Sequence, residues 1–245
     1  THRPPVIMPD MKRRRASTGE RIATIMTLAR RLPLTRQVLA DQLADATPSQ
    51  MEFMESWMNA EIESRERSKR SRLLKAAGFP ADKELDGYDW TPIRFPVDYG
   101  RQRIESLEFI SGHEDLVLFG PPGTGKTHLA AAIANHLIAQ GKPVICMTMI
   151  DLLERIKRTY SATGGSESDV LKIYKTVPLL VIDDIGKEPP TEWAISTVYN
   201  IINGRYEAYL PTIVTTNYDT EALIDRMTPR ESHDSMTARA TIDRL

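Results

Sequence analysis

The stretch that decides the fold is Gly120-Pro121-Pro122-Gly123-Thr124-Gly125-Lys126-Thr127. It contains every fixed position of the phosphate-binding loop pattern G-x-x-x-x-G-K-[ST]. An apolar run at 116–119 precedes it and an alanine-rich run at 127–139 follows, so the loop lies between a predicted strand and a predicted helix. Glycines let backbone N–H groups close around phosphate oxygens, and the N-terminus of a helix adds partial positive charge. The stretch therefore predicts a site for a nucleoside triphosphate.

Two side chains of this loop have separate tasks. Lys126 can reach the β- and γ-phosphates as a mobile point charge, and the hydroxyl of Thr127 can ligate Mg²⁺. We predict ATP and Mg²⁺ as cofactors. The predicted nucleotide-binding residues are Gly120, Pro121, Pro122, Gly123, Thr124, Gly125, Lys126, Thr127 and His128.

A pair of aspartates ends the apolar segment at 179–182. Open α/β sheets bind ligands at the carboxyl ends of their strands, so Asp183 is placed to hold the Mg²⁺ that Thr127 ligates. Asp184 is placed to polarise the attacking water. Many ATPases of this kind carry glutamate there, and the shorter aspartate predicts hydrolysis that is slow or needs a partner. The alternative is two solvated aspartates at a strand end.

Two further residues are candidates for reading the γ-phosphate. Asn217 ends a strand that begins near Thr212, and its amide could orient the lytic water, although asparagine after a strand is also ordinary turn chemistry. Near the end of the sequence, Arg244, and less favourably Arg239, could reach the γ-phosphate of a neighbouring subunit and stabilise transition-state charge. The alternative is a surface arginine paired with an aspartate.

A basic segment at 151–160 is the candidate nucleic-acid surface. Arg155, Lys157 and Arg158 stand beside Tyr160, and cations next to an aromatic ring suit single-stranded DNA. A solvated helix face explains the same residues. A second basic region lies at the start of the chain, where nine Lys and Arg within residues 1–40 face only Asp10 and Glu20. It predicts contact with nucleic acid or an acidic partner, or else a solvated tail.

The remaining pattern predicts an α/β fold with a parallel sheet, preceded by an all-helical region. Strand-like runs recur at 144–148, 179–182 and 212–216 between helical stretches. Upstream, Thr47-Pro48-Ser49-Gln50 reads as the start of a helix that turns basic and closes at Gly78, and a helix is expected at 101–110. We predict a helical partner- or DNA-binding region at 1–78, a linker at 79–100 and an ATPase domain at 101–245.

Composition excludes several classes of protein. Hydrophobic residues make up 41% and charged residues 27%, which is typical of a globular chain. The single Cys146 provides no disulfide framework, and the five histidines show no metal-ligand spacing. No apolar run is long enough to span a membrane. We expect a cytoplasmic protein with no membrane contact. A GTPase would need an Asn-Lys-x-Asp motif and a small-molecule kinase an arginine-rich lid, and neither is found.

Together these motifs resemble the DnaC/DnaI/IstB group of AAA+ ATPases, over about residues 47–245 and most strongly from 116 to 218. The resemblance rests on the phosphate loop, on Asp183-Asp184-Ile185-Gly186, on the segment from Thr191-Glu192-Trp193 to Asn203-Gly204-Arg205-Tyr206-Glu207, and on Thr215-Thr216-Asn217. It implies ATP-driven assembly on DNA as a homo-oligomer with nucleotide between subunits. By position it assigns Lys126, Asp184, Asn217 and Arg244 to catalysis, and Thr127 and Asp183 to the metal.

The group has two branches, and different parts of the chain resemble each. One branch loads the DnaB-type replicative helicase, and the Asp183-Asp184 pair and the segment around Arg205 are more similar to it. The other is the ATPase partner of a transposase and binds duplex DNA. The basic segment from Glu61 to Asp89 is more similar to that branch. We weight the core more heavily and expect a helicase loader in DNA replication, with a transposition helper as the alternative.

Overall fold

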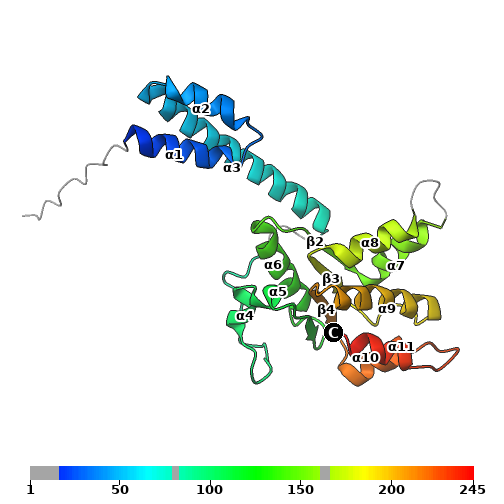
Figure 1. Cartoon of the computed structure of the whole chain (residues 1–245). Helices are drawn as coiled ribbons and strands as arrows, with labels where there is room; N and C mark the ends of the chain where they lie inside the picture. Colours follow the sequence, from blue (N-terminus) through cyan, green and yellow to red (C-terminus); the bar gives the residue numbers. More distant parts are fainter. Residues whose placement is uncertain (1–16, 79–82, 161–165) are drawn as a thin grey trace, which may run out of the picture. The chain divides into compact units, whose positions relative to one another are not determined.

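The computed structural model describes residues 17–78, 83–160 and 166–245. The chain divides into a helical unit, Thr1–Ser68, and an α/β unit, Lys69–Leu245 (Figure 1). Arg3 and the basic run at 12–15, which contribute most of the predicted basic surface at the start of the chain, lie outside the described residues.

In the described part of the helical unit, three helices pack around aliphatic and methionine side chains. Its helices are α1 (Thr18–Ala29), α2 (Arg36–Ala44) and α3 (Pro48–Ala77), the last of which continues into the α/β unit. Met51 and Met58 of α3 are buried against Ile25 and Leu43, so the methionines of this helix serve packing.

The predicted start of α3 is confirmed by its hydrogen bonds. The backbone N–H of Gln50 donates to the hydroxyl of Thr47 at 3.3 Å, and the N–H of Thr47 donates to the side chain of Gln50 at 2.8 Å. This reciprocal cap satisfies two N–H groups that the first turn leaves free. Helix α3 ends at Ala77, before Gly78, whose φ of +80° favours glycine.

A parallel sheet with strand order β1-β4-β3-β2 organises the described part of the α/β unit. The four runs that the sequence predicted as strands form it. Its strands are β1 (Leu116–Phe119), β2 (Val144–Thr148), β3 (Leu179–Asp183) and β4 (Thr212–Thr216), and its helices are α4 (Arg101–Glu105), α5 (Glu108–Ser111), α6 (Lys126–Ala139), α7 (Met149–Arg158), α8 (Glu167–Thr176), α9 (Glu192–Glu207), α10 (Thr220–Met227) and α11 (Met236–Ile242).

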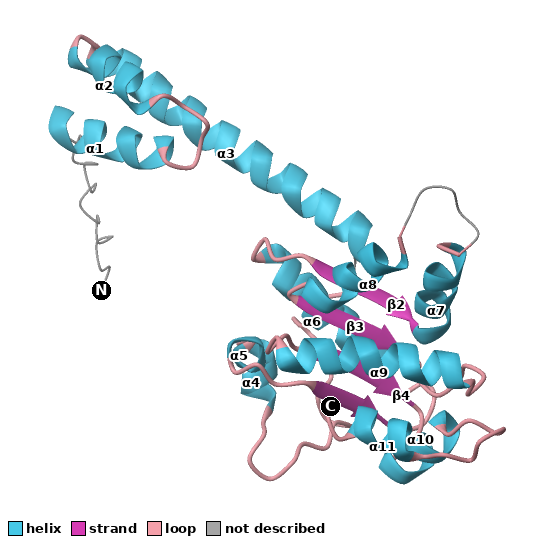
Figure 2. Cartoon of the chain, turned by 45° about the vertical axis from the view of Figure 1, so that its right-hand side comes forward, coloured by secondary structure: helices cyan, strands magenta, loops and turns pink. Residues whose placement is uncertain are grey.

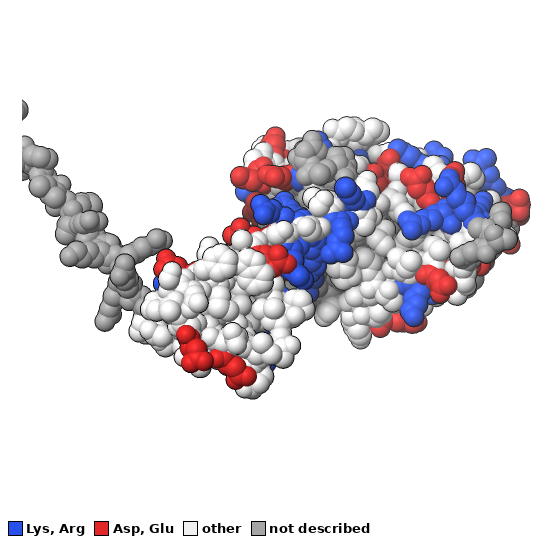
Figure 3. All heavy atoms as spheres, turned by 90° about the horizontal axis from the view of Figure 1, so that it is seen from above, with Lys and Arg blue, Asp and Glu red and all other residues white. Residues whose placement is uncertain are grey.

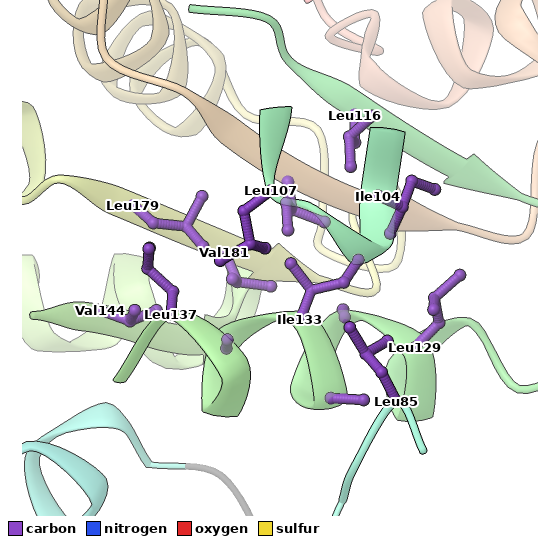
Figure 4. Packing of buried hydrophobic residues seen from close by; sticks show 14 of the residues in the cluster. Leu85, Ile104, Leu107, Leu116, Leu129, Ile133, Leu137, Val144, Leu179 and Val181 are labelled. Carbon is purple, nitrogen blue, oxygen red and sulfur yellow. The ribbon is translucent and has the colours of Figure 1, made fainter. Parts of the chain in front are cut away.

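Helices cover both faces of this sheet, as the alternation of strands and helices predicted. Side chains of a strand point alternately to its two faces, and β3 is buried on both. Leu179 and Val181 face α6, which Figure 4 shows through Leu129, Ile133 and Leu137. Leu180 and Ile182 belong to the second cluster, which contains side chains of α7 to α11. Figure 2 labels these helices together with the sheet.

The helix expected at 101–110 is instead two short helices, α4 and α5. Leu107 between them has a φ of +56°, in the left-handed region that interrupts a helix. The turn allows Ile104, Leu107 and Phe109 to be buried in one cluster. Burial of all three side chains contributes more stability than the local preference for a continuous helix. The sequence pattern could not reveal this, because it does not show which core the side chains reach.

Part of the segment predicted as a linker packs into the α/β unit. Leu85 and Trp90 are each 9% exposed and lie in the same hydrophobic cluster as α6. Tyr88 and Phe95 pack against this cluster. Residues 83–100 therefore supply side chains to the core of the α/β unit, and the division between the two units falls at Ser68.

Arg205 of α9 is fully buried, and it forms hydrogen bonds to the segment before β3 and to the first residue of β4. Its guanidinium donates to the carbonyl oxygens of Tyr174 and Val177, at 2.7 and 2.9 Å, and to the hydroxyl of Thr212 at 3.0 Å. Burial lowers the pKa of Arg205 to about 10. The charge of Arg205 also reaches Asp115, whose pKa burial raises to about 6. Arg205 is therefore a buried cation with a structural role at the start of β3 and β4.

Replacing Arg205 with methionine is expected to lower the free energy of unfolding by about 3–5 kcal/mol, because it leaves buried acceptors and a buried carboxyl without their cation. Asp115 has a raised pKa, so its protonated form is favoured in the folded state, and the stability it contributes is lost as pH rises through about 6. The loss should be larger near neutral pH than near pH 5, where Asp115 is mostly neutral. Urea unfolding at both pH values measures it. Arg230→Met, at an exposed position, is the control and should change little.

Cys146 of β2 is buried, and burial raises the pKa of its thiol, so the thiolate is strongly disfavoured.

Among the described residues, no helix combines the length and the apolar character needed to cross a membrane.

Candidate nucleotide-binding site

The phosphate loop connects β1 to α6 and has the backbone that the motif requires. Gly123 and Gly125 have φ values of +80° and +85°, which favour glycine. A Cβ at Gly125 would lie 3.3 Å from the hydroxyl of Tyr88, whereas one at Gly123 would meet no atom within 4 Å. The loop therefore leaves open space beside Gly123 at the N-terminus of a fourteen-residue helix, a cradle that fits a phosphate group.

Lys126 lies at the first position of α6, with its ammonium group held over the loop. Its Nζ donates to the carbonyl oxygens of Gly120 and Pro121, at 2.8 and 2.9 Å. The pKa of Lys126 is lowered chiefly by burial, while the charges of Asp184 and Asp183 raise it and that of Lys187 lowers it. The ammonium is thus already positioned at the mouth of the loop.

Asp183 meets the phosphate loop at the end of β3. Its carboxylate accepts hydrogen bonds from the hydroxyl of Thr127 at 2.9 Å and from the hydroxyl of Thr215 at 2.5 Å. Asp183 is 9% exposed. A hydroxyl and a carboxylate in contact provide the hard oxygen ligands that Mg²⁺ takes in nucleotide sites. The donor set fits a magnesium ion held between Thr127 and Asp183.

Asp184 leaves the strand in an unusual conformation. Its φ is +59°, and its N–H donates to the hydroxyl of Thr215 at 2.9 Å. Its carboxylate forms an ion pair with Lys187, with Oδ2 and Nζ 2.8 Å apart. The change of backbone direction separates the carboxylates of Asp183 and Asp184, so that one contacts Thr127 and the other contacts Lys187.

Asn217 is brought to the same edge of the sheet by strand pairing. Strand β4 lies between β1 and β3, and Thr216 pairs with Phe119, the last residue before the phosphate loop. Asn217 follows Thr216 directly and is partly exposed. The structure therefore gathers the predicted residues Lys126, Thr127, Asp183, Asp184 and Asn217 at the carboxyl edge of three adjacent strands.

A cleft of about 670 Å³ lies beside the phosphate loop. Tyr88 and His128 face each other there, with ring centroids 5.5 Å apart. The cleft is also lined by Asp89, Pro92 and the glycines at 123 and 125. Its aromatic and carboxylate groups suit the base and sugar of a nucleotide whose phosphates lie on the loop.

Arg244 lies away from this cluster, against α9. Its Nε donates to the side-chain oxygen of Asn203 at 2.6 Å, and its guanidinium carbon lies 5.0 Å from the centroid of the Tyr199 ring. Arg239 is half-exposed and pairs with Glu221 at 3.6 Å. The structure therefore does not bring either arginine into the nucleotide site of its own chain.

The predicted DNA-contacting residues lie on α7, which follows β2, and directly after that helix. Arg155, Lys157 and Arg158 are exposed on α7, and Tyr160 follows that helix and is 58% exposed. Several are engaged locally, since Lys157 lies 4.8 Å from the centroid of the Trp193 ring and Arg158 pairs with Glu154 at 3.2 Å.

The surface of the α/β unit carries mixed charge. Figure 3 shows Lys and Arg side chains exposed in groups on the α/β unit, with acidic side chains between them. The phenol of Tyr160 donates to Glu167 at 2.8 Å and accepts from the indole N–H of Trp193 at 3.1 Å.

Three residues of the site were not predicted. Thr215 is completely buried, and the sequence analysis named it only within the motif Thr215-Thr216-Asn217, without a role of its own. Lys187 stands three residues after Asp184, where nothing in the motif marks it. Tyr88 fell within the predicted linker, and only the packing of that segment onto the α/β unit places it beside the loop.

The parallel sheet, phosphate loop and Asp183 together define an ATP-binding protein of the AAA+ class. More narrowly, the chain belongs to the family of IstB-like ATP-binding proteins, whose model matches residues 28–245.

Relatives of two kinds are similar to the chain. The replicative helicase loader DnaC of Escherichia coli strain K12 is 37% identical over 123 residues, which is 50% of this chain and 49% of that protein. The putative ATP-binding protein of insertion sequence IS232 from Bacillus thuringiensis subsp. berliner is 31% identical over 215 residues, which is 85% of this chain and 82% of that protein. The crystal structure of DnaI has a TM-score of 0.53 and 26% identity, covering 69% of this chain and 92% of that one. The match to DnaC thus spans about half the length of that loader.

Proposed function

We propose that the chain hydrolyses ATP to ADP and phosphate with Mg²⁺. The observation that carries this proposal is the contact between Thr127 and Asp183 at the mouth of the phosphate loop, 2.9 Å between oxygens. Bound Mg²⁺ would neutralise phosphate charge there. Lys126 would hold the β- and γ-phosphates, Asp184 would polarise the attacking water, and Asn217 would orient it. The cleft beside Tyr88 and His128 would receive the adenosine.

We propose further that ATP governs an assembly of several copies on single-stranded DNA, and that this assembly delivers a replicative helicase. Similarity to helicase loaders supports this role, since DnaC is 37% identical over half of the chain and the DnaI structure covers 69% of it. The basic residues of α7 with Tyr160 would contact DNA, because exposed cations beside an aromatic ring suit a single strand. Hydrolysis would then release the partner.

The helical unit would hold that partner. Phe53 and Trp57 of α3 are 71% and 48% exposed and lie one turn apart. Trp57 lines a hollow of about 390 Å³ together with Val38, which is also exposed. Exposed aromatic side chains beside a hollow are typical anchors of protein interfaces.

A second candidate is the ATPase partner of a transposase. The similarity to the IS232 protein covers 85% of the chain, and the family model begins at residue 28, within α1. Both therefore extend further along the chain than the match to DnaC. This role would include binding of duplex DNA, for which the exposed basic residues in the second half of α3 are suited.

A pull-down with ATP and Mg²⁺ separates the two roles. The full chain should retain the replicative helicase, and Phe53→Ala with Trp57→Ala should reduce retention about tenfold or more, because two exposed anchors are lost. Val97→Ala, at a fully exposed position of the α/β unit, is the control. Retention of a transposase and tight binding to long duplex DNA, with no retention of the helicase, would instead favour the transposition role.

A further inference from the structure

The ion pair between Asp184 and Lys187 occupies the carboxylate to which the proposed function assigns water activation. Oδ2 of Asp184 lies 2.8 Å from Nζ of Lys187, and the two side chains are 33% and 45% exposed. The sequence did not predict this ion pair. The carboxylate that should polarise water is therefore already bound to a cation of its own chain.

The backbone around this pair is fixed. The N–H of Ile185 donates to the carbonyl of Thr215 at 3.0 Å, and the N–H of Gly186 donates to the carboxylate of Glu188 at 3.0 Å. Gly186 has a φ of +91°, and a Cβ there would lie 2.9 Å from a methyl carbon of Leu223. Because these contacts hold the main chain between Asp184 and Lys187, we expect the pair to open by rotation of its two side chains.

Lys187 has a second environment within reach. It also lines a cleft of about 970 Å³ that contains both acidic and basic side chains, those of Glu188, Asp225, Glu231, Arg226 and Arg230. An ammonium group that left Asp184 would have room to turn into this cleft of mixed charge. Opening the ion pair costs little because both of its side chains are partly exposed.

We propose that Lys187 restrains Asp184 and keeps hydrolysis slow until the pair opens. The inference rests on the proposed ATPase function and adds a regulatory residue to the same site. While the pair is closed, one carboxylate oxygen of Asp184 is bound to Lys187 and is less available to accept a proton from water. When it opens, both oxygens of Asp184 can face the γ-phosphate.

Replacing Lys187 with methionine tests this restraint. ATP turnover should rise about two- to fivefold, a modest factor in keeping with the partial exposure of the pair. The affinity for ATP, measured by calorimetry, should change less than twofold, roughly the scatter of such measurements. Lys187→Arg preserves the charge and should retain the wild-type rate. Lys142→Met, at an exposed position after α6, is the matched control. In an Asp184→Asn background, Lys187→Met should have no effect on turnover.

A double-mutant cycle in urea unfolding checks the pair without any nucleotide. Lys187→Met and Asp184→Asn should couple, so that the double variant loses less stability than the two single variants together. No coupling would overturn the inference, as would a fall in turnover in Lys187→Met with ATP affinity intact. Turnover that is undetectable in both the wild type and Lys187→Met would also overturn it. Absence of ATP binding in the wild type would instead remove the proposed function, while the coupling would still report the ion pair.

Discussion

Lys126→Ala is expected to weaken binding of Mg-ATP about a hundredfold or more, because it leaves the charge of the β- and γ-phosphates without its cation in a partly desolvated site. The ammonium group of Lys126 is held at the loop by two carbonyl oxygens, so its removal changes charge at that position without altering the glycine backbone. Isothermal titration calorimetry of the full chain measures the effect.

Two controls make the result specific. Lys142→Ala removes an exposed lysine just after the C-terminal end of α6 and should bind ATP as the wild type does. Urea unfolding of Lys126→Ala should show a stability close to that of the wild type. Unchanged ATP affinity in the well-folded Lys126→Ala protein would contradict the assignment of the phosphate loop.

Arg244→Ala should lower ATP turnover about a thousandfold while sparing ATP binding, as loss of an arginine finger does. Helix α9 begins near the nucleotide edge of the sheet, and Asn203, which binds Arg244, lies twelve residues beyond the cap Thr191. At 1.5 Å per residue this is about 18 Å along the helix. Arg244 is therefore better placed to act on a neighbouring copy than on its own nucleotide.

Mixing two inactive proteins tests this arrangement. Arg244→Ala keeps its own Asp184, and Asp184→Asn keeps its own Arg244, so a mixed assembly would contain some complete sites. Turnover in the mixture should exceed that of either protein alone. Arg239→Ala, which alters the half-exposed neighbour on α11, should retain most activity. A mixture with no more activity than its components would count against a shared site.

The nucleotide site was the most predictable part of this molecule, because its chemistry requires fixed residues at fixed spacing. Gly120 to Thr127 and Asp183 could be placed at one sheet edge because each follows a predicted strand, and parallel sheets bind ligands at the carboxyl ends of their strands. Thr215 and Lys187 could not, because their roles arise from contacts across strands and across a turn. Arg205 was noticed only as part of a family resemblance, and its burial beneath the sheet has no local sequence signal.

The ends of helices could be predicted where local capping preferences determine them, but not where tertiary packing determines them. The cap at Thr47 and the end at Gly78 follow from capping and glycine preferences. The break at Leu107 depends on three apolar side chains reaching one core, and the boundary at Ser68 depends on where contacts divide. Both are properties of the folded chain as a whole.

The burial of Cys146 makes the chain convenient for site-specific chemistry. It is the only cysteine, and a shielded thiol with a raised pKa reacts slowly with maleimides. A cysteine introduced by Met236→Cys, at a position that is 75% exposed on α11, would therefore carry a fluorophore or a cross-linker without prior removal of a native thiol. Energy transfer between labelled copies could then follow their association as ATP is added.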